Sequence, residues 1–435
     1  MSDLGRGPGA WTAERLGIRL ADAPGTPIPV ADLAGLAVRR NPRRAHLVVS
    51  RVLGKHVPVD PHLACTAGRA LARRVAGALA ARPGTGAPLV LGYAETATAL
   101  GHLVADALPG AGYLHSTRRS APPGAAVIRF EEAHSHATEH LLQPADPAMV
   151  PAGGPVVLVD DELTTGRTAV ATIRALHELH PRPHYVVASL LDLRSDADRQ
   201  ALAAVGASLG ARIDVVALGA ARLDLPADVL RRAQRLADAV NQPDAPVVAV
   251  GAPVQRLAPR WPAGLPEGGR HGFTTAHREP FTLAVDRLAG HVSDLLPSRG
   301  DVLVLGAEEL MYAPLRLAAA LAGRVDTPVR FSSTTRSPVL PVDDPGYAVR
   351  TRLTFPAHDG TDGVRYAYNV AAGRHGVRFA LVVLVVDDAG DTPDLWREDG
   401  LVAALRSAAD RVTVVVLPVV PATSLAAVSA PAAAR

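Results

Sequence analysis

The sequence predicts an α/β protein with mostly parallel sheets, built from two similar halves. Three observations predict this fold class. Short apolar segments alternate with helical segments of about a dozen residues, as they do where crossover helices join parallel strands. Several of the apolar segments are apolar throughout, which is typical of strands covered on both faces. Three short stretches of the first half also recur, in the same order, in the second half.

The first half, residues 41–250, alternates most clearly. Apolar spacings of three and four residues predict helices, and unbroken apolar runs predict buried strands. The expected strands are 45–52, 88–91, 156–159, 185–191 and 212–218, and the expected helices are 66–81, 95–108 and 168–179. Residues 1–40 are punctuated by proline and glycine and predict an irregular N-terminal extension.

A second stretch rich in proline and glycine, residues 251–272, predicts a linker or a long surface loop. The alternation then resumes in a second domain, residues 273–421. The expected helices there are 281–296 and 313–321, and the expected strands are 302–305, 379–386 and 412–419. Residues 422–435 are low in complexity and predict a disordered tail.

The two halves share three sequence patterns. LVLGYAE at 89–95 corresponds to LVLGAEE at 303–309, STRRS at 116–120 to STTRS at 333–337, and VVLVDD at 156–161 to VLVVDD at 383–388. Any one of these matches could arise by chance, but three in the same order indicate an internal duplication.

Composition limits the classes of function. The chain has 435 residues, 48% hydrophobic and 20% charged, which excludes wholesale disorder and allows two or three domains. The net charge is only +3, and the densest basic stretch, 39–44, is typical of a solvated face, so composition argues against a nucleic-acid partner. One cysteine, Cys65, excludes an internal disulfide and fits a reducing cytoplasm. The chain also lacks a leader pattern and a run of ~20 apolar residues, so we expect a cytoplasmic protein without a membrane partner.

The most informative stretch is VVLVDDELTTGRT at 156–168. An apolar strand leads into two carboxylates, Asp160 and Asp161, and then through a Thr/Gly turn into a helix, and ligands of open α/β sheets bind at this edge. The backbone N–H groups and hydroxyls of 164–168, at a helix N-terminus, predict a phosphate cradle. Carboxylates repel phosphate but accept hydrogen bonds from vicinal hydroxyls, so the stretch predicts a ribose 5-phosphate site. The alternative is that the two aspartates only cap the helix, but this interpretation does not explain the Thr/Gly turn.

This stretch resembles, at all 13 positions, the phosphoribosyl-pyrophosphate (PRPP) signature of type I phosphoribosyltransferases. The resemblance implies a Rossmann-like phosphoribosyltransferase fold and transfer of ribose 5-phosphate from PRPP to a nitrogen acceptor, with release of pyrophosphate. It implies that Asp160 and Asp161 bind the ribose hydroxyls in catalysis, with Mg²⁺ carried by PRPP and not by protein ligands. The residues that it assigns to the 5′-phosphate are Thr164, Thr165, Gly166, Arg167 and Thr168.

Two further segments fall where this family binds pyrophosphate. Arg118 and Arg119 lie where the family has a mobile catalytic loop, so they are candidates for neutralising pyrophosphate, although two surface arginines are the alternative. The expected pyrophosphate loop follows the strand 88–91 and consists of Gly92, Tyr93, Ala94 and Glu95.

The acceptor side is less well defined. The stretch EEAHSHATEH at 131–140 either faces the acceptor, with His134 and His136 as contacts, or forms a solvated helix. A third interpretation is a metal site, because His136 and His140 are four residues apart on one helix face. Lys55, the single lysine among 45 basic residues, and His56 are expected to contribute to a hood over the acceptor base.

A narrower resemblance covers residues about 40–420. RVLGKH at 51–56, the 132–140 run, RHGF at 270–273 and TRSP at 335–338 together resemble a bacterial phosphoribosyltransferase with a C-terminal TRSP domain, found in tellurite-resistance stress-response clusters. That family implies biosynthesis of a nucleoside-like metabolite. After Asp387 and Asp388 no Thr-Thr-Gly turn follows, so we expect the TRSP domain to be phosphoribosyltransferase-like but degenerate.

The main hypothesis is therefore an enzyme that transfers phosphoribose from PRPP to a base-like small molecule, and a homodimer is compatible with it. The alternative is a PRPP-sensing regulator on the same fold that binds nucleic acid. Such a regulator needs a basic helix-turn-helix or a basic face beyond 39–44. An interaction protein with a dead site is disfavoured by the intact stretch 160–168.

Overall fold

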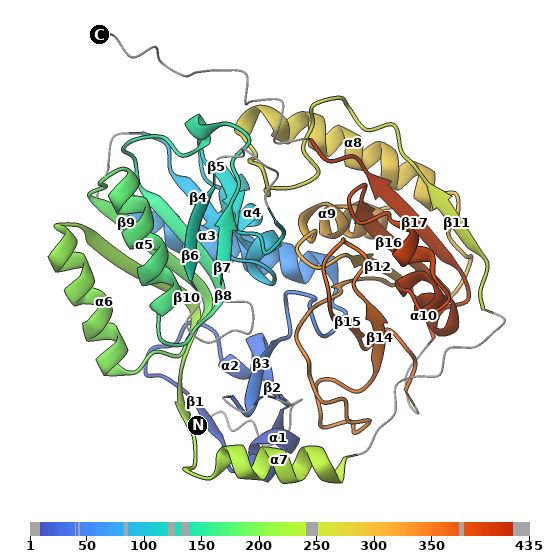
Figure 1. Ribbon diagram of the computed structural model, residues 1–435, viewed down its shortest axis with the longest axis horizontal. Coiled ribbons are helices and arrows are strands. Elements are labelled where there is room, and N and C mark those ends of the chain that lie inside the picture. Colours follow the sequence, from blue (N-terminus) through green and yellow to red (C-terminus); the bar gives the residue numbers. More distant parts are fainter. Residues whose placement is uncertain are drawn as a thin grey trace.

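The computed structural model describes residues 9–39, 41, 44–81, 86–120, 127–131, 139–240, 251–373 and 378–420. Two sheets lie side by side with helices packed against them, one sheet in each half of the chain (Figure 1). The strands are parallel except for one edge strand of the first sheet and three separate hairpins. The α/β fold with mostly parallel sheets is confirmed.

The first sheet has six strands. Its central strands are buried along their apolar stretches, as these sequences predict. In spatial order the strands are β1 (Arg19–Asp22), β10 (Arg212–Asp224), β9 (His184–Asp192), β8 (Val156–Leu163), β4 (Leu89–Gly92) and β5 (Gly112–His115). Only β1 runs antiparallel to its neighbour.

The second sheet has five parallel strands. In spatial order they are β11 (Val254–Leu257), β17 (Val412–Leu417), β16 (Leu381–Asp387), β12 (Val302–Gly306) and β13 (Val329–Ser333). The three hairpins are β2–β3 (Ala34–Val38 and His46–Ser50), β6–β7 (Ile128–Glu131 and Glu139–Leu142) and β14–β15 (Arg352–Pro356 and Val364–Tyr368).

The helices begin and end at local sequence signals. At the start of α3, Asp60 accepts a hydrogen bond from the His62 N–H and Pro61 occupies the first turn. The α-helices are α1 (Ala10–Leu16), α2 (Val30–Leu33), α3 (Pro61–Ala80), α4 (Ala97–Asp106), α5 (Arg167–Leu179), α6 (Asp196–Leu209), α7 (Val229–Ala239), α8 (Thr275–Ser293), α9 (Tyr312–Ala322) and α10 (Leu401–Ala408). Two short 3₁₀ helices lie at Pro147–Met149 and Pro393–Trp396.

The duplication is visible in the sheet topology. The order β9-β8-β4-β5 in the first half corresponds to β17-β16-β12-β13 in the second. The hairpins β6–β7 and β14–β15 also correspond, because each pairs with the segment that follows β5 or β13. Two phosphoribosyltransferase-like halves, as predicted, account for this arrangement.

The strand registers correct the predicted pairing of the two halves by one residue. Gly92 lies opposite His115 and Val159, whereas its counterpart Gly306 lies opposite Ser333 and Val385. Counting onward from these positions, Thr117 corresponds to Thr335, and Asp161, not Asp160, corresponds to Asp387. The sequence patterns, when aligned by their identical residues, predict a pairing of the two halves that differs from this one by one residue.

Two stretches expected to be irregular contain regular structure. The N-terminal stretch 1–40 contains α1, β1, α2 and β2, and β1 pairs with the edge of the first sheet. The stretch 251–272, expected to be a linker, contains β11, which pairs with β17. These strands are four or five residues long and are stabilised by pairing, so no periodicity reveals them. Strand β8 also continues past the expected end at Val159 to Leu163.

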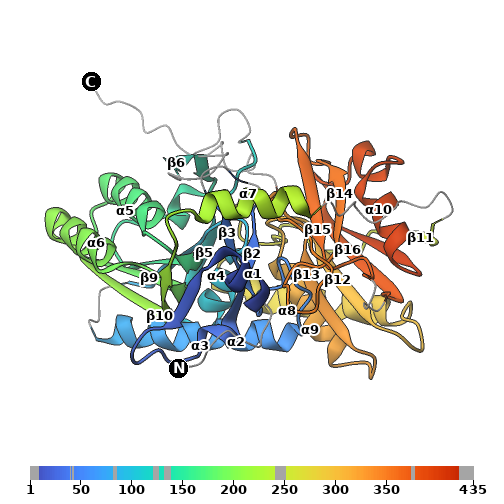
Figure 2. The same cartoon turned by 90° about the horizontal axis from the view of Figure 1, so that it is seen from below.

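The two halves share one hydrophobic cluster. The His102 ring stacks on Tyr312 of the other half with the ring centroids 3.5 Å apart, and Phe273 and Tyr113 exchange backbone hydrogen bonds across the junction. Helix α3 contacts α9 and β13 of the second half, and Figure 2 shows it running beneath both halves. The halves therefore pack as one unit with a common core.

Two further observations bear on the class of protein. In the described part of the chain, we find no helix with both the length and the apolar character needed to cross a membrane. Cys65 is a free, buried cysteine on α3.

Replacing Gly92 by alanine is expected to destabilise the fold by about 1–3 kcal/mol, because an added Cβ would overpack the core. That Cβ would lie 2.8 Å from the Ala97 carbonyl oxygen and within contact of the buried Tyr113 hydroxyl. Gly77→Ala on α3 is the matched control, since its Cβ would meet nothing within 4 Å. The control should gain up to about 1 kcal/mol from helix propensity. Denaturant unfolding of both variants measures the difference, and equal stabilities would contradict the prediction.

Candidate active site

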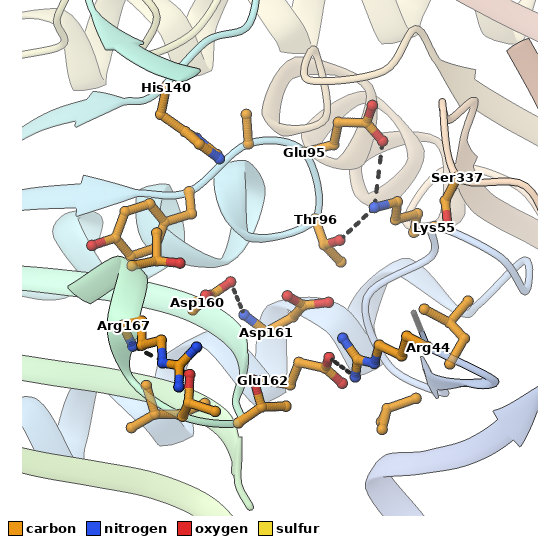
Figure 3. A pocket seen from close by; sticks show the side chains of 18 of the residues that line it. Arg44, Lys55, Glu95, Thr96, His140, Asp160, Asp161, Glu162, Arg167 and Ser337 are labelled. Carbon is orange, nitrogen blue, oxygen red and sulfur yellow. Dashed lines mark hydrogen bonds and ion pairs between the residues drawn. The ribbon is translucent and has the colours of Figure 1, made fainter. Parts of the chain in front are cut away.

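A cavity of about 290 Å³ opens at the carboxyl ends of β4 and β8. Three parts of the chain line it: the first sheet with its following turns, the β2–β3 region, and the loop after β13 in the second half. Figure 3 shows Asp160, Asp161 and Arg167 on one side of this cavity and Lys55 and Ser337 on the other. Its size lies near the lower end of the range found for small-molecule sites.

The predicted ribose and phosphate residues all line this cavity. Asp160 and Asp161 project from the last part of β8, and the Asp161 N–H donates to Asp160 Oδ1 over 2.9 Å. Among the described residues, nothing forms a hydrogen bond or ion pair with the Asp161 carboxylate. The predicted phosphate contacts that line the cavity are Thr164, Thr165, Gly166, Arg167 and Thr168.

The turn after β8 ends at the start of α5. Gly166 precedes the helix with φ +77°, a left-handed conformation that glycine adopts without steric cost. The Arg167 N–H lies 3.4 Å from Thr165 Oγ1, and the first-turn N–H groups of α5 point toward the turn. The arrangement has the donors and the dipole of an anion site at a helix N-terminus.

The predicted pyrophosphate loop lies on the neighbouring strand. Tyr93, Ala94 and Glu95 line the cavity, as does Arg118, whereas Gly92 is buried at the end of β4 and does not. The Gly92 carbonyl instead accepts a hydrogen bond from the Ser116 N–H over 2.9 Å. Three of the four residues predicted for this loop thus border the cavity, and Gly92 serves the packing beneath them, while binding of pyrophosphate stays a prediction.

Glu95 is an ionised carboxylate in a buried position. Burial alone would raise its pKa, but the charges of Lys55, Arg118 and Arg336 and a hydrogen bond from Thr335 lower the pKa to about 2. The carboxylate therefore stays charged at any working pH and can hold cations in place.

Arg119 lies away from the cavity. Its guanidinium reaches into the second half, where Nη1 lies 2.8 Å from Asp387 Oδ2 and Nε lies 3.6 Å from Asp359. The two arginines predicted to act together are therefore separated: Arg118 lines the cavity and Arg119 joins the halves. Neighbouring side chains of an extended segment point to opposite sides, which explains the split.

Lys55 and His56 lie at the cavity, but Lys55 faces the pyrophosphate loop. Its Nζ donates to Thr96 Oγ1 over 2.8 Å and lies 3.4 Å from Glu95 Oε2. His56 is buried, and none of the described residues forms a hydrogen bond with its Nε2. Burial and the nearby charges of Lys55 and Arg39 lower its pKa well below 6.5, so the imidazole is neutral.

The predicted histidine contacts with the acceptor stay predictions. His134 and His136 lie outside the described residues. His140 lines the cavity, with Nδ1 2.9 Å from Ser116 Oγ and its ring stacked on Phe130 in the β6–β7 hairpin, so this part is a strand and not a helix. Within the described ranges, no group of three or more His, Cys, Asp or Glu side chains is arranged to hold a metal ion.

Several residues of the cavity were not predicted as site residues. Arg44 Nη2 lies 2.5 Å from Glu162 Oε1, and Arg39 Nη2 donates to Ser337 Oγ over 3.0 Å. Both arginines belong to the basic stretch 39–44, whose density was the available signal. The loop after β13 contributes Arg336, Ser337 and Pro338, which the sequence presented only as part of a family motif.

The corresponding place in the second half is filled by side chains. Asp387, the counterpart of Asp161, accepts hydrogen bonds from Arg119 and from Arg270 Nη2, the latter over 2.9 Å. Arg270 also donates to Glu309 over 2.8 Å, and all four side chains are nearly inaccessible. A cavity of about 10 Å³ remains beside Arg270 and Glu309. Among the described residues, this place in the second half therefore has the fold without an open cavity, as the missing Thr-Thr-Gly turn predicts.

Comparisons with known proteins agree with this division. The model of the phosphoribosyl transferase family matches residues 33–222, and that of the TRSP domain C-terminal to this transferase matches residues 267–405. A search of curated protein sequences finds no match.

Solved structures similar to the chain include adenine phosphoribosyltransferases. That of Giardia lamblia, complexed with 9-deazaadenine, is 22% identical, with a TM-score of 0.26 over 34% of this chain and 78% of that one. That of Rhodothermus marinus is 21% identical, with a TM-score of 0.27 over 48% and 98% of the two chains. The family assignment rests on the two family models, which between them match most of the sequence. Residues 33–222 therefore belong to the phosphoribosyl transferase family, and residues 267–405 to the TRSP domain that follows this transferase.

Proposed function

We propose that this protein transfers ribose 5-phosphate from PRPP to a nitrogen atom of a base-like acceptor and releases pyrophosphate. The observation that carries the proposal is the single cavity lined by the Asp160–Thr168 stretch, by Tyr93–Thr96 and by Arg118. These segments bring together carboxylates that can accept hydrogen bonds from a diol, a turn that can bind an anion, and a cation. The boundaries 41–250 for the transferase domain and 273–421 for the TRSP domain are proposed with it.

The donor is held at two ends in this proposal. Asp160 and Asp161 accept hydrogen bonds from the ribose 2′ and 3′ hydroxyls, since ionised carboxylates are strong acceptors. Thr164, Thr165 and the first N–H groups of α5 bind the 5′-phosphate. Fixing both ends of the sugar orients C1′ toward the acceptor, which lowers the entropic part of the barrier.

The reaction breaks the bond between C1′ and the pyrophosphate oxygen and forms a bond from C1′ to the acceptor nitrogen. The electron pair of the broken bond leaves with pyrophosphate, and the proton that the acceptor nitrogen loses passes to the departing pyrophosphate or to solvent. Arg118 and Lys55 stabilise the negative charge that develops on the leaving group, because fixed charges in a dry site act without reorganisation. Glu95 holds Lys55 in that position.

Mg²⁺ is proposed to arrive bound to PRPP. The carboxylate oxygens of Asp160 and Asp161 are of the type that suits this hard cation. When bound, Mg²⁺ neutralises part of the pyrophosphate charge. The acceptor is proposed to lie on the side of the cavity lined by His56, with Lys55 assigned to the leaving group and not to the acceptor.

The experiment that tests this function incubates the protein with Mg-PRPP, a panel of nucleobases and cell extract, and detects ribosylated products by mass spectrometry. We expect pyrophosphate release that depends on both Mg-PRPP and an acceptor. A protein that binds Mg-PRPP, forms no product and instead shifts DNA or RNA at physiological salt would support the regulator alternative. Failure to bind Mg-PRPP would overturn both.

The biological setting is also a proposal. The two-domain architecture resembles enzymes of tellurite-resistance stress-response clusters, so we propose a role in the biosynthesis of a nucleoside-like metabolite in the cytoplasm. A homodimer remains compatible with the surface, and light scattering of the purified chain would test it.

A further inference from the structure

The loop that gives the TRSP domain its name lies at the active site of the other half. It follows β13 and runs Thr335-Arg336-Ser337-Pro338, and its last three residues line the donor cavity. Thr335 is fully buried, and Ser337 is nearly so. The loop is therefore one wall of the pocket, supplied by a residue range more than a hundred positions from the PRPP stretch.

The first link between this loop and the transferase half is Glu95. Its Oε2 accepts a hydrogen bond from the Thr335 hydroxyl over 2.7 Å, and its Oε1 accepts one from the Arg336 N–H over 3.3 Å. The same Oε2 lies 3.4 Å from Lys55 Nζ. Both oxygens of Glu95 are thus oriented by the TRSP loop, and the oriented carboxylate fixes the ammonium that faces the pyrophosphate loop (Figure 3).

The second link is Ser337. Its Oγ accepts a hydrogen bond from Arg39 Nη2 over 3.0 Å, and Arg39 also forms a β-bridge with Val339 just beyond the loop. Arg39 lines the donor cavity as Lys55 does. Two cations of the pocket are therefore placed by two residues of the TRSP loop, one through Glu95 and one directly.

The second half makes the reciprocal contact at its own, filled site. Thr117, the counterpart of Thr335, donates to Glu309 Oε1 over 2.7 Å and is equally buried. The two contacts have the same length, the same chemistry and the same burial, but only that of Thr335 borders an open cavity. A comparison of Thr335 with Thr117 can therefore distinguish an effect on the donor pocket from an effect on the packing of the two halves.

We propose that Thr335 and Ser337 are positioning residues for phosphoribosyl transfer, and that the TRSP domain acts as a built-in second subunit that completes the donor pocket. They fix Lys55 and Arg39 where the pyrophosphate of the donor carries its charge. This inference rests on the proposed function. It assigns the TRSP domain a role at the active site that requires no catalysis of its own.

The test measures the dissociation constant for Mg-PRPP by calorimetry on the full chain. Thr335→Val removes the hydroxyl at nearly constant volume, so Glu95 loses a charge-assisted hydrogen bond and we expect binding to weaken about tenfold. Thr335→Ser keeps the hydroxyl and should bind within about twofold of the unchanged protein. Thr117→Val is the matched control, expected to lower the melting temperature as Thr335→Val does while leaving Mg-PRPP affinity within about twofold.

The outcomes separate the two proposals. Equal affinities for Thr335→Val and Thr117→Val would show that the loop only joins the halves and would overturn the inference. Should Thr335→Val fail to fold, Ser337→Ala at the cavity rim supplies the same measurement, and unchanged affinity there would overturn it too. If the unchanged protein itself binds no Mg-PRPP, the proposed function fails and the inference falls with it.

Discussion

Asp161→Asn is expected to lower kcat/KM for Mg-PRPP about a hundredfold while leaving the fold intact. The carboxylate lines the donor cavity at the end of β8 and, among the described residues, forms no hydrogen bond or ion pair that the fold would lose. A hydrogen bond to a charged acceptor contributes about 1.5–3 kcal/mol, and each 1.36 kcal/mol in the transition state is tenfold in rate. An amide accepts such a bond more weakly, and half of its polar atoms donate instead.

The measurement is PRPP-dependent pyrophosphate release, with thermal unfolding as the control for folding. An unchanged melting temperature together with reduced turnover would place Asp161 at the donor. Undiminished pyrophosphate release by a fully folded variant would contradict the assignment of this carboxylate to the ribose.

The fold class could be predicted because its central strands are long apolar runs. The strands β4, β8, β12 and β16 and the helices α4, α5 and α9 lie within a few residues of their predicted places. The edge strands β1 and β11 were missed because four-residue strands carry no periodicity and depend on pairing with a neighbour. Helix α6 was also missed, although its capping box, with Ser195 and Asp198, is a signal that the sequence does contain.

The donor side of the site was predictable because it is contiguous in sequence. One turn between β8 and α5 supplies all of the predicted phosphate contacts, so thirteen adjacent residues carry the information. The wall formed by Arg39, Ser337 and Pro338 was not predictable, since it depends on how the β2–β3 hairpin and the second half pack against the first sheet. The direction of the Arg119 side chain likewise depends on Asp387, 268 positions away.

The duplication places the same residue type in two different surroundings, so that one half contains an open cavity and the other half supports it. Corresponding positions hold Asp161 and Asp387, yet the first faces a cavity while the second is 1% exposed at its side chain. The difference lies in what surrounds them: the Thr-Thr-Gly turn leaves space in front of Asp161, whereas Arg119 and Arg270 occupy the equivalent space before Asp387.

Asp387→Asn is accordingly expected to destabilise the protein by about 3–5 kcal/mol, the cost of breaking a buried ion pair on one side. Burial would raise the pKa of Asp387, but Arg119, Arg270 and the Gly390 N–H hold it well below its usual 3.8. A carboxylate with a lowered folded pKa stabilises the protein above its unfolded pKa and loses that contribution as the pH falls through the folded value. The effect of the substitution should therefore be full at neutral pH and shrink below pH about 4.

Denaturant unfolding at several pH values measures this loss, and Asp161→Asn serves as its matched control because the two aspartates are counterparts in the duplicated fold. The two variants should behave in opposite ways, with Asp387→Asn unstable and Asp161→Asn stable but impaired in turnover. If Asp387→Asn were as stable as the unchanged protein, the ion-pair cluster would contribute nothing to holding the halves together. In that case the separation of one catalytic half from one supporting half would need another physical basis, since the same residue borders an open cavity at position 161 and two arginines at position 387.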